Sequence, residues 1–160
     1  MIKTAGHDKI AWAARNERGA CPLEGHQAEN CQPMFRHVIE IAPVDIDHMG
    51  HVNNSVYLRW VQDAVVEYWE KLAPSEAVAK HLWVALQHQI SYRKPTFLSD
   101  TVVAEVVAEQ VRGARAFFNT VVTRGGEVLV EVKSCWCCLD AATKRPVRLK
   151  QDIVDRFFRP

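Results

Sequence analysis

Five stretches of the chain alternate apolar and polar residues with the period of a β-strand. The first, MFRHVIEIA, ends at Pro43, and its apolar face consists of Phe35, His37, Ile39 and Ile41. In the second, WVALQHQISY, one side carries Val84, Leu86, His88, Ile90 and Tyr92. Three more strands are predicted over residues 101–111, 115–124 and 127–139, and the Gly125-Gly126 pair is a hairpin signal between the last two.

A long amphipathic helix is predicted over residues 54–72, and Pro74 ends it. Its apolar residues follow the i, i+3, i+4, i+7 spacing of one buried face: Tyr57, Trp60, Val61, Ala64, Tyr68 and Leu72. Shorter helices are predicted over residues 75–81 and about 149–158. Because one apolar helix face and a largely antiparallel five-stranded sheet must bury each other, the pattern predicts an α+β fold with the helix lying across the sheet.

The first 32 residues lack sustained periodicity, although Ile10 to Ala14 has the pattern of one helical turn. We interpret residues 1–32 as an N-terminal extension that is partly ordered at best, and residues 33–160 as one domain. The chain contains no internal repeat and no low-complexity tract.

Composition narrows the class of protein. With 160 residues, of which 48% are hydrophobic, the chain is long enough for one domain with a core. A net charge of +1 argues against a broad basic field, so no nucleic-acid partner is expected. No apolar run approaches the roughly 20 residues that span a bilayer, and the first residues lack a signal-peptide core. We therefore expect no membrane association and a cytoplasmic location.

The five cysteines are an odd number, which argues against a complete disulfide framework. Strand alternation places Cys135 and Cys137 on one face and Cys138 on the other, which is poor geometry for a metal cage and predicts buried, reduced thiols. Cys21 and Cys31 flank His26 and have the side chains for a metal site or a cross-link. A pair of cysteines in a loose polar segment is more often incidental.

The segment at the start of the long helix reads Asp47-x-x-Gly50-His51-Val52-Asn53-Asn54-x-x-Tyr57. Ser91-Tyr92-Arg93-Lys94-Pro95 and Gly-Ala-Arg at 113–115 follow later. Together, over residues 34–158, these motifs resemble the hotdog-fold acyl-CoA thioesterases of the 4-hydroxybenzoyl-CoA thioesterase family. The resemblance implies a long central helix wrapped by a five-stranded sheet. It also implies hydrolysis of an acyl-CoA without a further cofactor, because coenzyme A is part of the substrate.

The resemblance assigns Asp47 as nucleophile or general base and the Asn54 backbone N–H as oxyanion donor. This assignment is chemically sound, since the first turn of a helix has unpaired N–H groups and a partial positive charge that polarises a carbonyl. Gly50 allows a sharp turn or a close approach to substrate. His51 orients the thioester or the acid in one interpretation and only bonds the loop in another.

Several residues near this motif have competing interpretations. Glu67, on the border of the apolar helix face, is the rival acid, because some hotdog thioesterases use a helix glutamate. His88 is more typical of a core histidine than of a catalytic one. Asp45 is expected to be structural, and Asn53 is expected to cap the helix, while the Asn54 side chain is a candidate to orient Asp47.

The ring side chains and one departure from a related motif bear on the substrate. Tyr57 and Trp60 lie on the apolar helix face, where core packing is the default, and their first-turn positions also suit a pocket wall. The five tryptophans fill volume that a long acyl chain needs, so we expect a compact acyl group. Plant acyl-carrier-protein thioesterases carry an asparagine at the position of Met49, which favours coenzyme A here and weakens an essential role for His51.

The remaining expectations concern partners. No glycine-rich phosphate loop is present, so Arg93, Lys94, Arg112 and Arg115 are the candidates for binding the phosphates of coenzyme A. The resemblance implies a homodimer or homotetramer with a shared active site. Two rival functions are a hotdog-fold hydratase or dehydratase and a noncatalytic acyl-CoA-binding module, and release of free thiol distinguishes the thioesterase from both.

Overall fold

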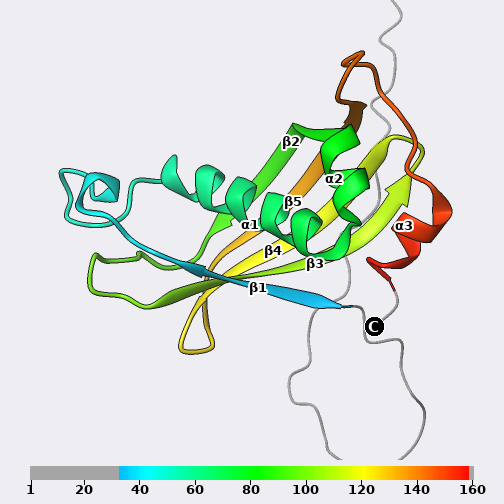
Figure 1. Cartoon of the computed structure of the whole chain (residues 1–160). Coiled ribbons are helices and arrows are strands. Elements are labelled where there is room, and N and C mark those ends of the chain that lie inside the picture. The colour runs from blue at the N-terminus through cyan, green and yellow to red at the C-terminus, as the bar shows by residue number, and fades with distance from the viewer. Residues whose placement is uncertain (1–32, 159–160) are drawn as a thin grey trace, which may run out of the picture.

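A computed structural model describes residues 33–158 (Figure 1), so the expectations for residues 1–32 lie outside the described part. The elements are β1 (Met34–Ile39), the 3-10 helix η1 (Pro43–Asp45), α1 (Val56–Leu72), α2 (Ser75–Lys80), β2 (His81–Tyr92), β3 (Val102–Arg112), β4 (Arg115–Arg124), β5 (Glu127–Asp140) and α3 (Gln151–Asp155). All five predicted strands and all three predicted helices are present, with shifts at their ends.

The strands form one sheet in the order β1-β3-β4-β5-β2, and every neighbouring pair is antiparallel. Helix α1 lies across one face of this sheet (Figure 1). The core lies between them, because the inward residues of β3, β4 and β5 meet the apolar stripe of α1. The predicted α+β class, with one long helix on an antiparallel sheet, is confirmed.

The predicted face of β2 is wrong in its first half. A bulge between Ala85 and Gln87 interrupts the pairing of β2 with β5, and one extra residue reverses the alternation of the strand. Val84 and Leu86 are therefore exposed, at 45% and 51%, whereas His88 lies on the inner face beyond the bulge. A strict period of two cannot detect such an inserted residue.

Helix α1 begins at Val56, later than the predicted start at residue 54. The Asn53 side chain accepts hydrogen bonds from the backbone N–H and the hydroxyl of Ser55, at 2.9 and 2.8 Å. Polar side chains at helix starts offer the backbone this alternative to helical bonding. The N-cap of α1 is Ser55, which makes no side-chain cap bond, so Asn53 shapes the turn before the cap and does not cap the helix as expected.

The carboxyl end of α1 packs in an aromatic cluster. Trp69 stacks on Phe157 with ring centroids 5.9 Å apart and meets Trp83 edge-on at 5.5 Å. Tyr68 contacts Phe157 edge-on at 5.3 Å and stacks on Phe35 at 5.4 Å. This cluster joins α1 to β1, β2 and the segment after α3.

Two further predictions concern cysteines and membranes. Cys135, Cys137 and Cys138 are free; Cys137 and Cys138 are buried as expected, whereas Cys135 is only partly buried. Burial raises the pKa of Cys138 to about 12, which keeps this thiol protonated. Between residues 33 and 158, no helix has both the length and the apolar composition of a bilayer-spanning segment.

Candidate active site

Asp47 lies in a tight loop between η1 and α1. Its backbone N–H donates to the His51 carbonyl at 2.9 Å, and its carbonyl accepts from the Gly50 N–H at 3.0 Å. Gly50 has a φ of +81°, a left-handed conformation that glycine adopts without steric cost. The Asp47 side chain is 11% exposed, and its Oδ1 accepts the Met49 N–H at 2.8 Å. The loop backbone thus bonds Oδ1 of Asp47, while Oδ2 faces His51.

His51 lies beside that second oxygen. Its Nδ1 is 3.6 Å from Asp47 Oδ2 and 3.4 Å from the Val52 carbonyl oxygen. The ring is therefore placed between the acid and the loop backbone, where it can orient the carboxylate.

The Asn54 backbone N–H, just before α1, is an unused donor among the described residues. The Asn53 N–H donates to the Asp45 carbonyl at 2.8 Å, and the Val56 N–H donates to the Asn53 carbonyl at 2.9 Å. Within residues 33–158, no acceptor pairs with the Asn54 N–H. An unpaired N–H at the amino end of a helix of 17 residues is suited to an oxyanion. The Asn54 side chain makes no hydrogen bond to Asp47 among these residues.

A second loop, after β2, fixes this backbone from the other side. The Tyr92 hydroxyl donates to the Asn54 carbonyl at 2.9 Å, and the Val52 N–H donates to the Thr96 carbonyl at 2.8 Å. The Tyr57 hydroxyl donates to Thr96 Oγ1 at 2.9 Å. Burial raises the pKa of both Tyr57 and Tyr92, so both remain protonated donors.

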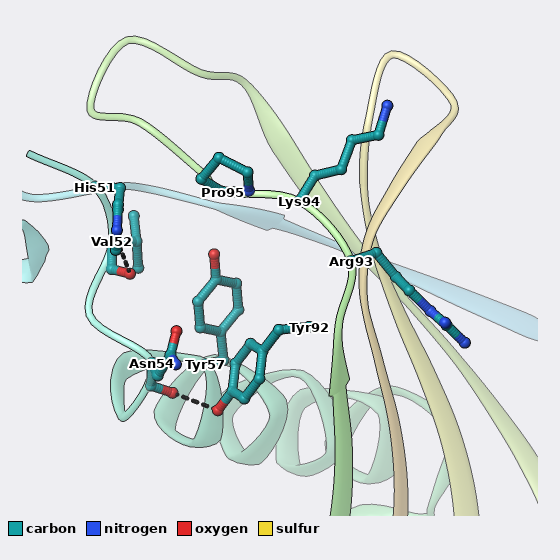
Figure 2. A pocket seen from close by; sticks show the side chains of 8 residues that line it. All are labelled: His51, Val52, Asn54, Tyr57, Tyr92, Arg93, Lys94 and Pro95. Carbon is teal, nitrogen blue, oxygen red and sulfur yellow. Dashed lines mark hydrogen bonds between the residues drawn. The ribbon is translucent and has the colours of Figure 1, made fainter.

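The two loops form an open cavity of about 220 Å³ at the amino end of α1 (Figure 2). It is lined by His51, Val52, Asn54, Tyr57, Tyr92, Arg93, Lys94 and Pro95. His51, Asn54 and Tyr57 come from the motif before α1, whereas the other wall comes from the end of β2 and the loop after it. Asp47 does not line the cavity itself, but its Oδ2 lies 3.6 Å from Nδ1 of the lining residue His51.

The basic residues at the cavity are engaged elsewhere. Arg93 bonds Glu131 through Nε and Nη2, at 3.0 and 2.7 Å, and Lys94 pairs with Glu127. Figure 2 shows both side chains pointing away from the cavity. Arg124 extends this network by bonding Asp100 at 2.6 Å.

The other predicted site residues lie apart from the cavity. Trp60 is 3% exposed and packs edge-on against Tyr57, at 5.0 Å, so it supports the wall from behind. Arg115 pairs with Arg112 at the far end of the β3–β4 hairpin. One copy of the chain therefore does not bring these two arginines to the same site as Asp47.

The rival acid and the core histidine have other partners. Glu67 Oε2 lies 2.5 Å from His37 Nδ1 of β1. Glu67 is eleven residues past Val56, which places it about 17 Å along the helix from its start. His88 lies edge-on to Trp136 at 5.7 Å, and its Nδ1 is buried without a partner among the described residues. Burial lowers the pKa of His88 and favours the neutral ring.

Four residues of this site were not singled out from the sequence, and one of them, Val52, belongs to the quoted motif before α1. Tyr92 and Pro95 belong to the quoted Ser91–Pro95 stretch, which could have indicated a pocket wall. Thr96 gives no such signal, because its carbonyl and hydroxyl gain their roles only when the second loop meets α1. In the described part of the chain, no three His, Cys, Asp or Glu side chains lie close enough together to hold a metal ion.

Comparison with known proteins gives a family model and a curated relative that are both described as thioesterases. The family model described as "Thioesterase-like superfamily" matches residues 41–157. The long-chain acyl-CoA thioesterase FadM of Escherichia coli is 25% identical over 126 residues, which cover 74% of this chain and 93% of FadM.

Solved structures share the fold. A thioesterase from Thermus thermophilus, complexed with coenzyme A and Zn, has a TM-score of 0.67 and 24% identity, covering 77% of this chain and 90% of its own. The protein SAV2348 from Staphylococcus aureus, in complex with CoA, has a TM-score of 0.69 and 16% identity, covering 78% of this chain and 82% of its own. Because the family model spans most of the described residues, the chain belongs to the thioesterase-like superfamily, with the hotdog fold and the thioester-hydrolase class that the motif around Asp47 implies.

Proposed function

We propose that this chain is an acyl-CoA thioesterase in which Asp47 is the nucleophile or general base and the Asn54 backbone N–H polarises the thioester carbonyl. The observation that carries the proposal is the Asn54 N–H, which is unpaired among the described residues and belongs to a residue that lines the same cavity as His51. His51 in turn lies 3.6 Å from the Asp47 carboxylate. FadM acts on acyl-CoA, and two of the similar structures contain coenzyme A, which supports this substrate handle.

The Asn54 N–H acts on the carbonyl oxygen. As the carbonyl carbon becomes tetrahedral, negative charge develops on this oxygen, and a donor already in place stabilises it without reorganisation. The positive end of the α1 dipole adds to this effect. The hydrogen bond from Tyr92 to the Asn54 carbonyl holds the adjoining peptide in position.

Asp47 acts on the carbonyl carbon by one of two paths. In the covalent path, its carboxylate attacks the carbon, CoA leaves as a thiolate, and water hydrolyses the mixed anhydride. In the direct path, Asp47 takes a proton from a water molecule whose oxygen attacks the carbon. An unlabelled acid from a single turnover in H₂¹⁸O identifies the covalent path, because hydrolysis of the anhydride at its Asp47 carbonyl transfers an unlabelled oxygen to the product, whereas the direct path always labels it.

Recognition of the nucleotide uses Arg93 and Lys94. Their pairs with Glu131 and Glu127 are exposed, and exposed ion pairs contribute little, so phosphates of coenzyme A can replace the carboxylates. Lys94→Met is expected to raise KM several-fold with little change in kcat. Arg115 contributes only if another copy of the chain brings it to the cavity.

We propose a compact acyl group. The cavity of about 220 Å³ is smaller than the roughly 300–1,000 Å³ of typical small-molecule sites, and tyrosine rings form its wall. A panel from acetyl-CoA to palmitoyl-CoA, with benzoyl-CoA and phenylacetyl-CoA, tests this by kcat/KM. A steady rise to the longest chain would overturn the compact group and match the substrate class of FadM.

Two copies of the chain are proposed to pair along β2, which is an edge strand. Leu82, Val84 and Leu86 are 41%, 45% and 51% exposed there, a row of apolar side chains beside unpaired strand edge groups. Such a homodimer, alone or within a tetramer, would add residues of the partner to the open side of the cavity. Light scattering of the wild type and of Val84→Lys measures the association.

The test of the function is release of free thiol from acyl-CoA. Asp47→Asn keeps the Oδ1 that accepts the Met49 N–H, so it preserves the loop while removing the basic carboxylate. It is expected to lower kcat at least about a hundredfold, with an unchanged melting temperature. Glu67→Gln is the matched control, because it changes the rival acid in the same way. Full activity of Asp47→Asn and loss in Glu67→Gln would transfer the role to Glu67.

The same assay separates the rival functions. A hydratase or dehydratase alters the acyl chain and leaves the thioester intact, so it releases no thiol. A noncatalytic module gives only a rise in melting temperature with acyl-CoA.

A further inference from the structure

We propose that Asp45 and Arg59 form a positioning pair that sets the distance between the Asp47 carboxylate and the Asn54 backbone N–H. The inference rests on the proposed function, because it concerns how these two groups are held for one reaction. The sequence alone predicts only a structural role for Asp45 and none for Arg59.

The Asp45 side chain is 1% exposed and bonds to two separate segments. Its Oδ2 accepts the Ala42 N–H at 3.0 Å, before η1, and its Oδ1 accepts Arg59 Nη2 at 2.5 Å, on the first turn of α1. A buried carboxylate is costly unless it is paired and hydrogen-bonded, and here both oxygens have donors. The pair therefore ties the loop that carries Asp47 to the helix that it precedes.

The backbone of Asp45 closes the same loop. Its carbonyl accepts the Asn53 N–H at 2.8 Å, and Ile46 and Val52 form an isolated antiparallel bridge next to this bond. Residues 45–53 are thus a small loop whose two ends meet at Asp45. These two contacts form the neck of the loop. Asp47 directly follows Ile46 of the neck, and Asn54 directly follows Asn53.

Because of this placement, the position of Asp45 determines the positions of both the Asp47 carboxylate and the Asn54 N–H. If Arg59 is removed, the buried carboxylate loses its charged partner and is driven toward water, and the neck moves with it. The acid and the oxyanion donor then shift relative to each other. Misplacement of reacting groups by about 1 Å costs on the order of a hundredfold in rate. Since neither residue lines the cavity, substrate affinity should change little.

The experiment compares Arg59→Met, Arg59→Lys and Asp45→Asn with wild type, well below each melting temperature. Arg59→Met is expected to lower kcat about ten- to a hundredfold with KM within about threefold. Arg59→Lys keeps the positive charge, so its kcat should lie between those of Arg59→Met and wild type. If Arg59→Met does not fold, Arg59→Lys is the test variant. Arg36→Met is the matched control, because it removes an ion pair with Glu105 between β1 and β3, at 3.4 Å, and should leave kcat unchanged.

A second arm distinguishes positioning from a general structural role. The distance between Asp47 and Asn54 matters only when both groups act, so Arg59→Met should change the residual rate of Asp47→Asn by less than about twofold. An equal loss of kcat in both backgrounds overturns the proposal, as does a kcat of Arg59→Met and Arg59→Lys within about twofold of wild type.

A third readout needs no substrate. Exchange of the Asn53 amide hydrogen, which is bonded to the Asp45 carbonyl, should be faster in Arg59→Met than in Arg36→Met. If wild type releases no thiol, the proposed function fails, whereas faster exchange in Arg59→Met still supports the brace formed by Asp45 and Arg59. Unchanged exchange overturns the brace itself.

Discussion

The two ends of helix α1 are held by different kinds of contact. At its amino end the surrounding loops are joined by directional hydrogen bonds, such as Tyr92 to Asn54 and Arg59 to Asp45. At its carboxyl end Trp69 packs between the rings of Phe157 and Trp83. Hydrogen bonds fix the orientation of the groups that they join, here around the unpaired Asn54 N–H, whereas ring packing stabilises the fold mainly by burying apolar surface. We therefore expect changes at the amino end to reduce activity and changes at the carboxyl end to reduce stability.

The largest effect is expected from Trp69→Ala, which removes a side chain that is only 3% exposed. Loss of a core tryptophan costs about 3–5 kcal/mol of unfolding free energy, because it removes apolar burial and leaves a cavity. Denaturant titration measures this loss, and kcat per folded molecule should stay within about twofold. Trp69→Phe should cost much less, since the Trp69 Nε1 has no hydrogen-bond partner among the described residues. A fall in kcat at full folding would break the proposed division between the two ends.

A smaller effect is expected from Gly50→Ala in the loop of Asp47. No atom lies within 4 Å of an added Cβ, so the cost arises from the left-handed backbone, about 1–2 kcal/mol. The loop can relieve this strain by moving Asp47, so kcat should fall as well as stability. Gly113→Ala is the matched control, with a φ of +63° in the β3–β4 turn. It should lose similar stability and keep kcat, and equal kcat values for the two variants would refute the link to Asp47.

How much of this arrangement the sequence predicts depends on how local each contact is. The face of α1 and the loop motif depend on spacing within one segment, so the amino-acid pattern alone is enough to place Tyr57, Asp47 and Asn54 near the start of the helix. Thr96, by contrast, reaches Tyr57 across a separation of 39 residues, and no local pattern encodes that meeting. The β2 bulge could not be predicted either. It lies between Ala85 and Gln87, and an apolar residue such as Leu86 fits the alternating pattern whether or not a bulge is present.

Tyr92→Phe tests one directional contact at the amino end. Loss of the hydroxyl removes one hydrogen bond to the Asn54 carbonyl, which costs about 0.5–1.5 kcal/mol. Because this bond steadies the oxyanion donor, kcat should fall a few-fold. Tyr68→Phe is chemically matched, since the Tyr68 hydroxyl donates to the Pro33 carbonyl at 3.0 Å, remote from the cavity. Stopped-flow thiol release should show a lower kcat only in Tyr92→Phe, and equal kcat values would mean that Tyr92 merely packs.

The smallest effect concerns His88, a polar ring of β2 that packs edge-on against Trp136. Its buried Nδ1 has no partner within residues 33–158, and burial lowers its pKa below the ordinary value of about 6.5. Below about pH 6.5 the unfolded chain binds a proton that the folded ring resists, so His88 makes stability fall with acidification, until the pH passes the folded pKa. At higher pH both states are neutral and the effect vanishes. His88→Phe removes this contribution, so its melting temperature should fall less than that of wild type between about pH 7.5 and 5.5. Scanning calorimetry at both pH values measures the difference, and parallel losses would show that His88 takes up its proton as readily in the folded chain.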